Sequence, residues 1–205
     1  MGRKISTDRV KKNRSQKRKI LIAVEGNNKT EKLYFNNFEH FDSNFNISYA
    51  KGNDTDPLGL VQMLIKEIKK LEIDLNKTDI AYCIFDTDVD INKNKIINKA
   101  IKLATKNKIN VITSTPCIEL WFLLHYIYTT ASMENDEVLK RLKLYIPKYE
   151  KNVNIFSDIN NNMNLAIQRA KKLEKYQIDN GKIINTVEAN PNTEIYKIVE
   201  ELLKK

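Results

Sequence analysis

Two hydrophobic periods alternate along the first 130 residues. Near-continuous apolar runs at 19–24 and 80–85 are typical of strands buried on both faces of a sheet. Shorter strand patterns cover 45–50 and 110–113. Helical spacing of apolar residues separates them, at 29–38, 58–71, 96–104 and 117–128. Asp56 followed by Pro57 predicts the start of the second helix, because Asp is a good N-cap and Pro suits the first helical position.

This order of elements predicts an α/β fold. Strands alternating with helices favour a mostly parallel sheet, here of about four strands flanked by helices and joined by right-handed crossovers. After residue 130 the pattern changes to three helical segments, 137–145, 162–176 and 193–203. We therefore expect a flexible basic arm at 1–19, an α/β domain at 20–130, and a C-terminal helical elaboration at 131–205 packed on that core.

Charge is concentrated at the N-terminus. The chain has 35 Lys/Arg and 26 Asp/Glu, for a net charge of +9. Residues 1–19 hold nine of the basic residues and one acid, a net +8, which leaves 26 basic and 25 acidic residues, a net +1, for the rest. Such an arm suits a polyanion, because neutralised phosphates release counterions. Nucleic acid is therefore an expected partner, and a solubilising tail is the alternative.

Cysteine usage and hydropathy indicate a cytoplasmic protein. Cys83 and Cys117 both lie in apolar surroundings, which favours reduced core thiols. The N-terminal segment lacks the apolar region of a secretory signal. No apolar run approaches the roughly 20 residues that span a bilayer, so no membrane association is expected.

The turn after the first strand, AVEGNNKTEKLYF, superficially resembles a phosphate-binding loop. A Walker A loop needs two glycines where Ala23 and Asn28 stand, and the charge of Glu25 would repel phosphates. A calcium loop starting at Asp86 fails in the same way, because it needs Gly where Ile91 stands and Glu where Ile97 stands. Both motifs are therefore rejected.

Carboxylates follow two of the predicted strands. Glu25 comes directly after the first strand, Asp86 directly after the third, and Asp88 would share a face with Asp86 if the chain stays extended. Sites in open parallel sheets form beyond the carboxyl ends of the strands, so the three acids should converge. Clustered carboxylates need cations or protons, and hard oxygen ligands suit Mg²⁺ or Mn²⁺. Gly26 would leave room beside Glu25 for metal and phosphate.

Three further residues carry open alternatives. Glu119 begins a helix near the same edge, as a fourth ligand or as a charge that compensates the helix dipole. Lys29 is either a cation that stabilises transition-state charge or a solvated lysine at a helix start. His125 shares a helical face with Trp121 and is interpreted as a core imidazole in preference to a phosphate contact or an acid. The roles of Glu31 and Asp90 stay open.

The pairing of Glu25-Gly26 with Asp86-Thr87-Asp88 resembles the Toprim metal-binding fold. Three segments also resemble the RloB family of bacterial proteins: EGNNKTE from Glu25, TPCIELWFLLH from Thr115, and NPNTEIY from Asn190. The resemblance implies a metal-dependent nuclease in antiviral defence or abortive infection, with Glu25, Asp86 and Asp88 as metal ligands. Glu119 is the fourth metal ligand that we expect from its position near the same edge. It also implies an ATPase partner protein from the same locus.

The substrate is left open between DNA and RNA such as tRNA, since metal sites contact phosphates and not bases. The alternative function is a non-catalytic Toprim-like module that binds nucleic acid or a partner. A phospho-accepting acidic pocket, with Asp86 as the acceptor, is a third interpretation. We also expect an assembly, either with the partner or as a homo-oligomer, because a toxic nuclease needs restraint.

Overall fold

The structure is a computed structural model that describes residues 17–26, 29–40 and 43–204. Most of the basic arm, residues 1–16, lies outside this part, as do Asn27 and Asn28 of the first turn. In chain order the elements are β1 (Arg18–Val24), α1 (Thr30–Phe35), η1 (Asn36–Phe38), β2 (Phe45–Tyr49), α2 (Pro57–Lys70), β3 (Ile80–Asp86), η2 (Ile91–Lys93), α3 (Asn94–Lys106), β4 (Asn110–Thr115), α4 (Glu119–Leu124), α5 (Asn135–Lys143), α6 (Phe156–Ile159), η3 (Asn160–Asn162), α7 (Met163–Asp179), β5 (Asn192–Thr193) and α8 (Ile195–Leu202).

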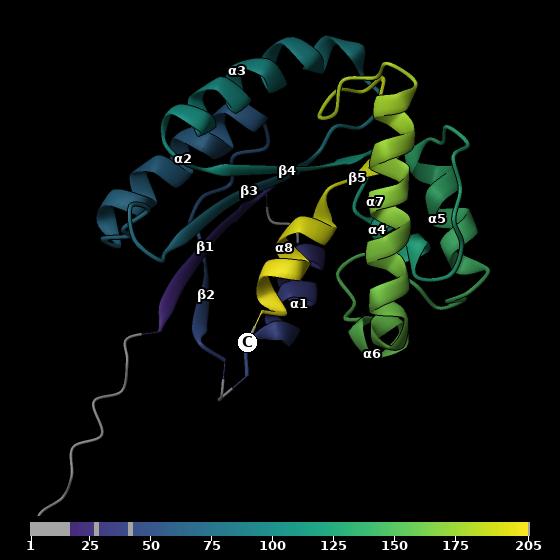
Figure 1. The fold of residues 1–205 in the computed structure, drawn as a ribbon, viewed down its shortest axis with the longest axis horizontal. Helices are drawn as coiled ribbons and strands as arrows, with labels where there is room; N and C mark the ends of the chain where they lie inside the picture. The colour runs from purple at the N-terminus through teal and green to yellow at the C-terminus, as the bar shows by residue number, and fades with distance from the viewer. Residues whose placement is uncertain (1–16, 27–28, 41–42, 205) are drawn as a thin grey trace, which may run out of the picture.

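One sheet with the strand order β2-β1-β3-β4-β5 forms the centre of the fold (Figure 1). The first four strands are parallel, and β5 pairs antiparallel with β4. The α/β class and the mostly parallel sheet are therefore confirmed, and the arrangement fits a Toprim-like fold. The parallel strands are buried on both faces, which explains their near-continuous apolar runs.

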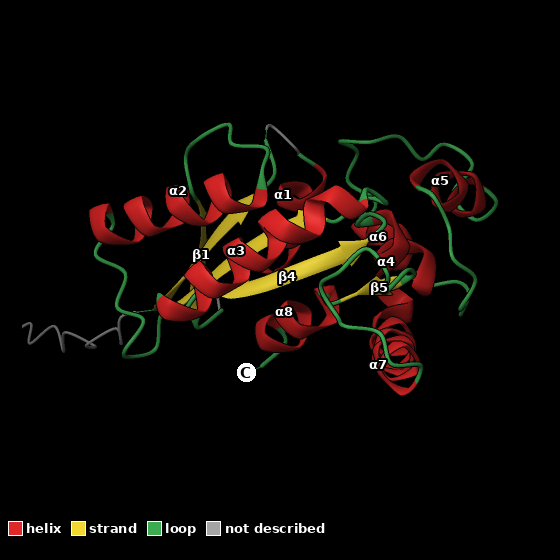
Figure 2. Ribbon diagram, turned by 90° about the horizontal axis from the view of Figure 1, so that it is seen from above, coloured by secondary structure: helices red, strands yellow, loops and turns green. Residues whose placement is uncertain are grey.

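Helices cover both faces of the sheet (Figure 2). On one face, α2 and α3 pack against alternate strand residues such as Leu21, Ala23 and Cys83. On the other face, α1, α4, α7 and α8 form a larger core with the intervening residues, including Ile22 and Ile84. The strand residues alternate between these two cores because successive side chains point to opposite faces.

The start of α2 shows how local sequence sets an element. The Asp56 side chain accepts hydrogen bonds from the backbone N–H groups of Leu58 and Gly59, both at 3.0 Å. Pro57 occupies the first helical position, where a missing N–H costs nothing. The predicted cap is thus confirmed.

Other boundaries differ from the sequence prediction. The helix predicted over 117–128 is only α4, Glu119–Leu124, although the apolar residues around it are buried as expected. β1 begins at Arg18, inside the segment assigned to the arm. Arg18 forms an ion pair with Glu201, and the Lys19 N–H donates to Asp79 at 2.8 Å, so both residues belong to the folded body.

The C-terminal region does more than cover the sheet with helices. Asn192 and Thr193, at the start of the predicted helical segment 193–203, form the edge strand β5, and α8 begins at Ile195. Ser114 and Thr193 share a 2.8 Å hydrogen bond between their hydroxyls, and Glu194 accepts from the Thr113 N–H at 3.2 Å. A run of two residues has no periodicity from which a strand could be predicted. No helix in the described part of the chain has the length and apolar character to cross a membrane.

Candidate active site

Glu25 and Asp86 lie at the carboxyl ends of neighbouring strands. Val24 of β1 pairs with Ile84 of β3, so the residues that follow each strand emerge at the same edge of the sheet. Gly26 adopts a positive φ of 54° and its N–H donates to the Asp54 carbonyl at 2.9 Å. The chain thus turns sharply away after Glu25, in a backbone conformation that glycine adopts without strain.

Asp86 lies at the centre of the acidic group. Asp86 is half-buried by its exposed surface, and many protein atoms lie around its carboxyl group. Burial raises its pKa well above the ordinary value, and the charges of Glu31, Glu119, Glu25 and Asp88 raise it further. Three carboxylates from other parts of the chain, and Asp88 two residues away, are therefore close enough to repel a charge on Asp86. Glu25 and Asp86 thus follow the ends of paired parallel strands, as strand order predicts.

Glu31 is a member of this group that the sequence left undecided. It lies in the first turn of α1 and is only 3% exposed. Burial raises the pKa of its carboxyl to about 7, and the nearby charges of Glu119 and Glu25 act in the same direction. The available signal was its position in the first turn of a helix that begins beside Glu25. That signal is weak, because acidic residues are common in first turns for electrostatic reasons.

Asp88 adopts a conformation that the sequence did not predict. Its φ is 50°, so the chain after β3 is not extended and the simple alternation argument fails at this residue. Asp88 still neighbours Asp86, and its carboxylate forms an ion pair with Lys93. The Asn135 side chain donates to its other oxygen at 3.0 Å. The amide oxygen of Asn135 is buried without a hydrogen-bond partner in the described part of the chain.

Glu119 begins α4 and is 2% exposed. The buried Tyr149 hydroxyl donates a 2.9 Å hydrogen bond to one of its carboxylate oxygens. Burial and the charge of Glu119 both raise the pKa of Tyr149, so this group remains a phenol donor at neutral pH. Tyr149 gave no signal in the sequence, since it lies in a segment between predicted helices.

The cations near the carboxylates include two that the sequence did not single out. The structure places Lys29 at the exposed start of α1. Burial raises the pKa of Glu25, and the charge of Asp88 raises it further. The positive charges of Lys93 and Lys151 act in the opposite direction and partly offset this rise. Lys93 is engaged by Asp88, whereas Lys151 is exposed.

His125 is a core residue. It is 1% exposed, its Nδ1 lies 2.9 Å from the Trp121 carbonyl oxygen, and its ring packs edge-on against the Trp121 ring at 4.9 Å. Burial lowers its pKa to about 4, so it is neutral at pH 7. Cys83 and Cys117 are buried free thiols whose pKa burial raises. Asp90, also left open, caps the short helix η2 through the Asn92 N–H.

The family model for RloB-like proteins matches residues 20–202. The chain belongs to the RloB-like protein family. The match includes all five carboxylates, together with Lys93, Asn135, Tyr149 and Lys151. No curated protein and no solved structure matches this RloB-like chain.

The donor set of the RloB-like site fits a hard divalent cation. Its five carboxylates offer only oxygen atoms, as Mg²⁺ and Mn²⁺ prefer, and the orphaned Asn135 oxygen lies beside Asp88. A cation would also relieve the mutual repulsion that raises the pKa of Asp86 and Glu31. Within the described residues, no three Asp, Glu, His or Cys side chains form a ready-made metal cage. The carboxylates thus lie near one another, but among the described residues no three of them are placed to coordinate a single ion.

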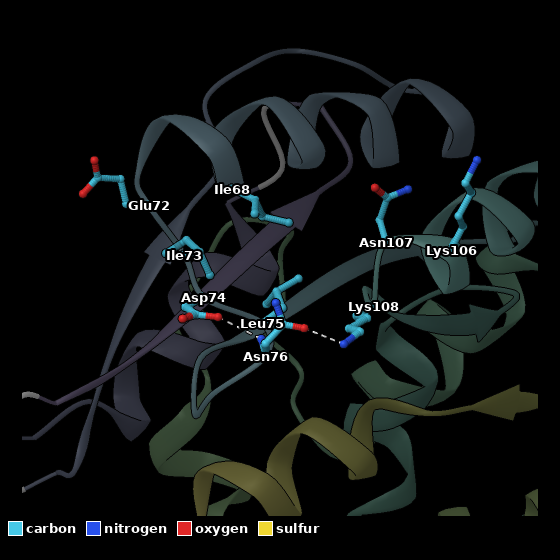
Figure 3. Close-up of a pocket in the computed structure, with 9 residues that line it drawn as sticks. All are labelled: Ile68, Glu72, Ile73, Asp74, Leu75, Asn76, Lys106, Asn107 and Lys108. Atoms are coloured by element: carbon cyan, nitrogen blue, oxygen red, sulfur yellow. Dashed lines mark hydrogen bonds between the residues drawn. The ribbon is translucent and has the colours of Figure 1, made fainter.

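A separate pocket lies at the opposite edge of the sheet of this RloB-like protein (Figure 3). It is formed where α2 and α3 end, and Lys108 donates to the Asn76 side chain at 2.6 Å across it. Glu72 and Asp74 line the same pocket and offset its lysines. Since parallel strands place their carboxyl ends at the other edge, this pocket is remote from the acidic group.

Proposed function

We propose that this RloB-like protein is a Mg²⁺- or Mn²⁺-dependent nuclease that hydrolyses phosphodiester bonds, with a role in bacterial defence against phage. The observation that carries the proposal is the acidic group around Asp86 at the carboxyl edge of the sheet. Crowded carboxylates destabilise a fold unless cations or protons neutralise them. A site that retains five of them at this edge is most simply explained by cation binding.

Glu25, Glu31, Asp86, Asp88 and Glu119 are the residues that would hold the ions. A bound divalent ion supplies Lewis-acid stabilisation of phosphate charge and lowers the pKa of water. Lys93 and Asn135 would orient Asp88, and Tyr149 would orient Glu119, through the contacts described above. Glu31, with a pKa of about 7, can hold a proton at neutral pH when no metal is bound.

The decisive experiment incubates the full chain with total RNA and with plasmid DNA, each with Mg²⁺, Mn²⁺ or EDTA. We expect cleavage of one substrate class with metal, and at least a hundredfold loss in Asp86→Asn. Asp90→Asn is the matched control, because Asp90 belongs to the same loop but is exposed and caps η2. Cleavage that continues in excess EDTA would reject the proposal, as would full activity of Asp86→Asn.

The alternative function, a non-catalytic binding module, predicts metal binding and nucleic-acid binding without cleavage under any condition. The ion pair between Lys93 and Asp88 favours this alternative, because the Asp88 carboxylate is already neutralised without a metal. Measuring Mn²⁺ binding by electron paramagnetic resonance beside the cleavage assay separates the two functions. An ATPase partner and self-association remain part of the proposal, and co-purification and light scattering test them.

A further inference from the structure

The segment from Tyr149 to Asn152, in the C-terminal half of the chain, makes one hydrogen bond to the acidic group and two to the start of α1, the helix that carries Glu31. It lies in the connection between α5 and α6, far in sequence from β1 and β3. Its first contact is the 2.9 Å hydrogen bond from the buried Tyr149 hydroxyl to Glu119. This bond fixes one end of the segment directly against a carboxylate of the site.

The other end of the segment is fixed to the start of α1. The Asn152 side chain accepts a 3.0 Å hydrogen bond from the Lys29 N–H, and the Asn152 N–H donates to the Thr30 hydroxyl at 3.0 Å. This reciprocal pair satisfies a backbone donor at the beginning of the helix that carries Glu31. Asn152 has a φ of 65°, a conformation that Asn tolerates better than most residues.

Lys151 lies between these two fixed points. Its backbone is therefore held at the acidic group, while its side chain remains exposed. The charge of Lys151 acts on both Glu25 and Glu31, yet it forms no ion pair with any residue that the structure describes. Lys93 differs, because its ammonium group is committed to Asp88. Lys151 thus offers a positive charge at the rim of the site that is available to a ligand.

We propose that Lys151 binds a backbone phosphate of the nucleic acid beside the scissile bond, on a segment that Tyr149 and Asn152 hold in place. This inference rests on the proposed function and adds to it a substrate-binding residue contributed by the C-terminal region. An acidic site repels a polyanion, so a cation fixed at its rim stabilises the approach of the phosphate backbone. The lysine contacts phosphate and is not expected to read sequence.

The test measures binding of a fluorescein-labelled single-stranded oligonucleotide by anisotropy, using the full chain in the Asp86→Asn background, between 50 and about 200 mM salt. We expect Lys151→Ala to weaken binding about threefold or more at low salt. We also expect it to lower the slope of log K against log salt by about 0.7, the value of one single-strand phosphate contact. Lys151→Arg should retain both the affinity at low salt and the salt slope of the parent. Lys148→Ala is the matched control, because Lys148 is an exposed lysine directly before this segment, and its binding should equal that of the parent.

The outcomes separate this inference from the nuclease proposal. If Lys151→Ala binds like Lys148→Ala, or the parent binds no oligonucleotide at low salt, the inference is overturned even when the wild type cleaves. If the Lys151 effect is present but the wild type cleaves nothing, nuclease activity fails and the phosphate contact stands. Because Lys151 is exposed, thermal unfolding of Lys151→Ala should match that of the parent, which excludes misfolding as the cause.

Discussion

At the scale of single residues, crowded carboxylates give the site its character. Asp86 and Glu31 both have raised pKa values, because burial and neighbouring negative charges disfavour their ionised forms. These groups oppose folding when they are charged, so their presence is a cost that a purely structural role does not explain. Binding sites commonly carry such perturbed groups, and that is why we interpret the group as functional.

Glu31 makes a pH-dependent prediction for the metal-free protein. Its carboxyl has an ordinary pKa of 4.5 and a folded-state pKa of about 7, so the folded state holds a proton that the unfolded state releases between these values. The stability from this proton is complete below about pH 4.5 and is lost as pH rises through 7. Asp86 acts with the same sign. Urea unfolding in EDTA from pH 5 to about 8 should show this fall.

Two comparisons check the assignment. Glu31→Gln removes the titrating group, so the free energy of unfolding of this variant should fall less as pH rises. Glu150 is exposed, so Glu150→Gln should behave like the wild type. Mg²⁺ should raise stability most at the alkaline end, where the carboxylates are ionised and able to bind it. An equal fall with pH in wild type and Glu31→Gln would show that Glu31 is not responsible.

At the scale of elements, the site depends on short connections as much as on helices and strands. Asp86 and Glu25 are placed by β3 and β1, but Glu31 and Glu119 lie in first turns of helices whose ends are held by side chains from elsewhere. The Tyr149 hydroxyl connects the segment after α5 to the first residue of α4. Elements that are short, such as the six-residue α1 and α4, need such tertiary contacts because isolated helices of this length are unstable.

Tyr149→Phe tests the contact between these elements. The substitution removes the hydroxyl and leaves a buried Glu119 oxygen without its donor, which should cost roughly 1–3 kcal/mol of unfolding free energy. Metal affinity should also fall, because Glu119 loses its orientation. Tyr145→Phe is the control, since Tyr145 is exposed and stacks on Tyr126 through its ring. Urea unfolding and Mn²⁺ titration measure the two effects. Equal stability of the two variants would contradict the expected role of the hydrogen bond.

At the scale of the whole molecule, the basic N-terminal sequence joins the sheet at the end opposite the acidic group. The acidic group occupies the carboxyl edge of the sheet, whereas β1 starts at the opposite edge, where the basic arm joins the folded body. The arm holds most of the excess positive charge of the chain. Arg18 and Lys19 belong to β1 and contact Glu201 and Asp79, so they contribute to folding as well as to charge.

Removal of residues 2–16 tests the arm without disturbing β1. This segment contains six Lys/Arg, so its loss should weaken nucleic-acid binding at low salt. The slope of log K against log salt should also become less steep, by the equivalent of several phosphate contacts. Thermal unfolding should stay within error of the full chain, because the deletion ends before Arg18. A full-length variant with the six basic residues changed to Gln controls for length. If both proteins bind like the wild type, the arm is a solubilising tail.

Much of the fold was predictable from the sequence because its signals are local. Buried parallel strands produce continuous apolar runs, and Asp56-Pro57 predicts a helix start. The rule that sites form at the carboxyl ends of parallel strands then placed Glu25 and Asp86 at one edge. These inferences need only the neighbours of each residue in the chain and a general property of parallel sheets.

The remaining features depend on segments that meet only in the folded chain. The edge strand β5 is two residues long, and its pairing with β4 defines it. Asn152 and Thr30 are 122 residues apart, and the φ of Asp88 departs from extended chain where Lys93 and Asn135 hold its carboxylate. The sequence by itself determined the α/β fold, the order of its parallel strands and the helices between them, and the strand ends that bear carboxylates. Only the tertiary structure decided that Glu31 joins them and that Tyr149, Lys151 and Asn152 lie against them, because such contacts follow from packing between distant segments and leave no periodic trace in the chain.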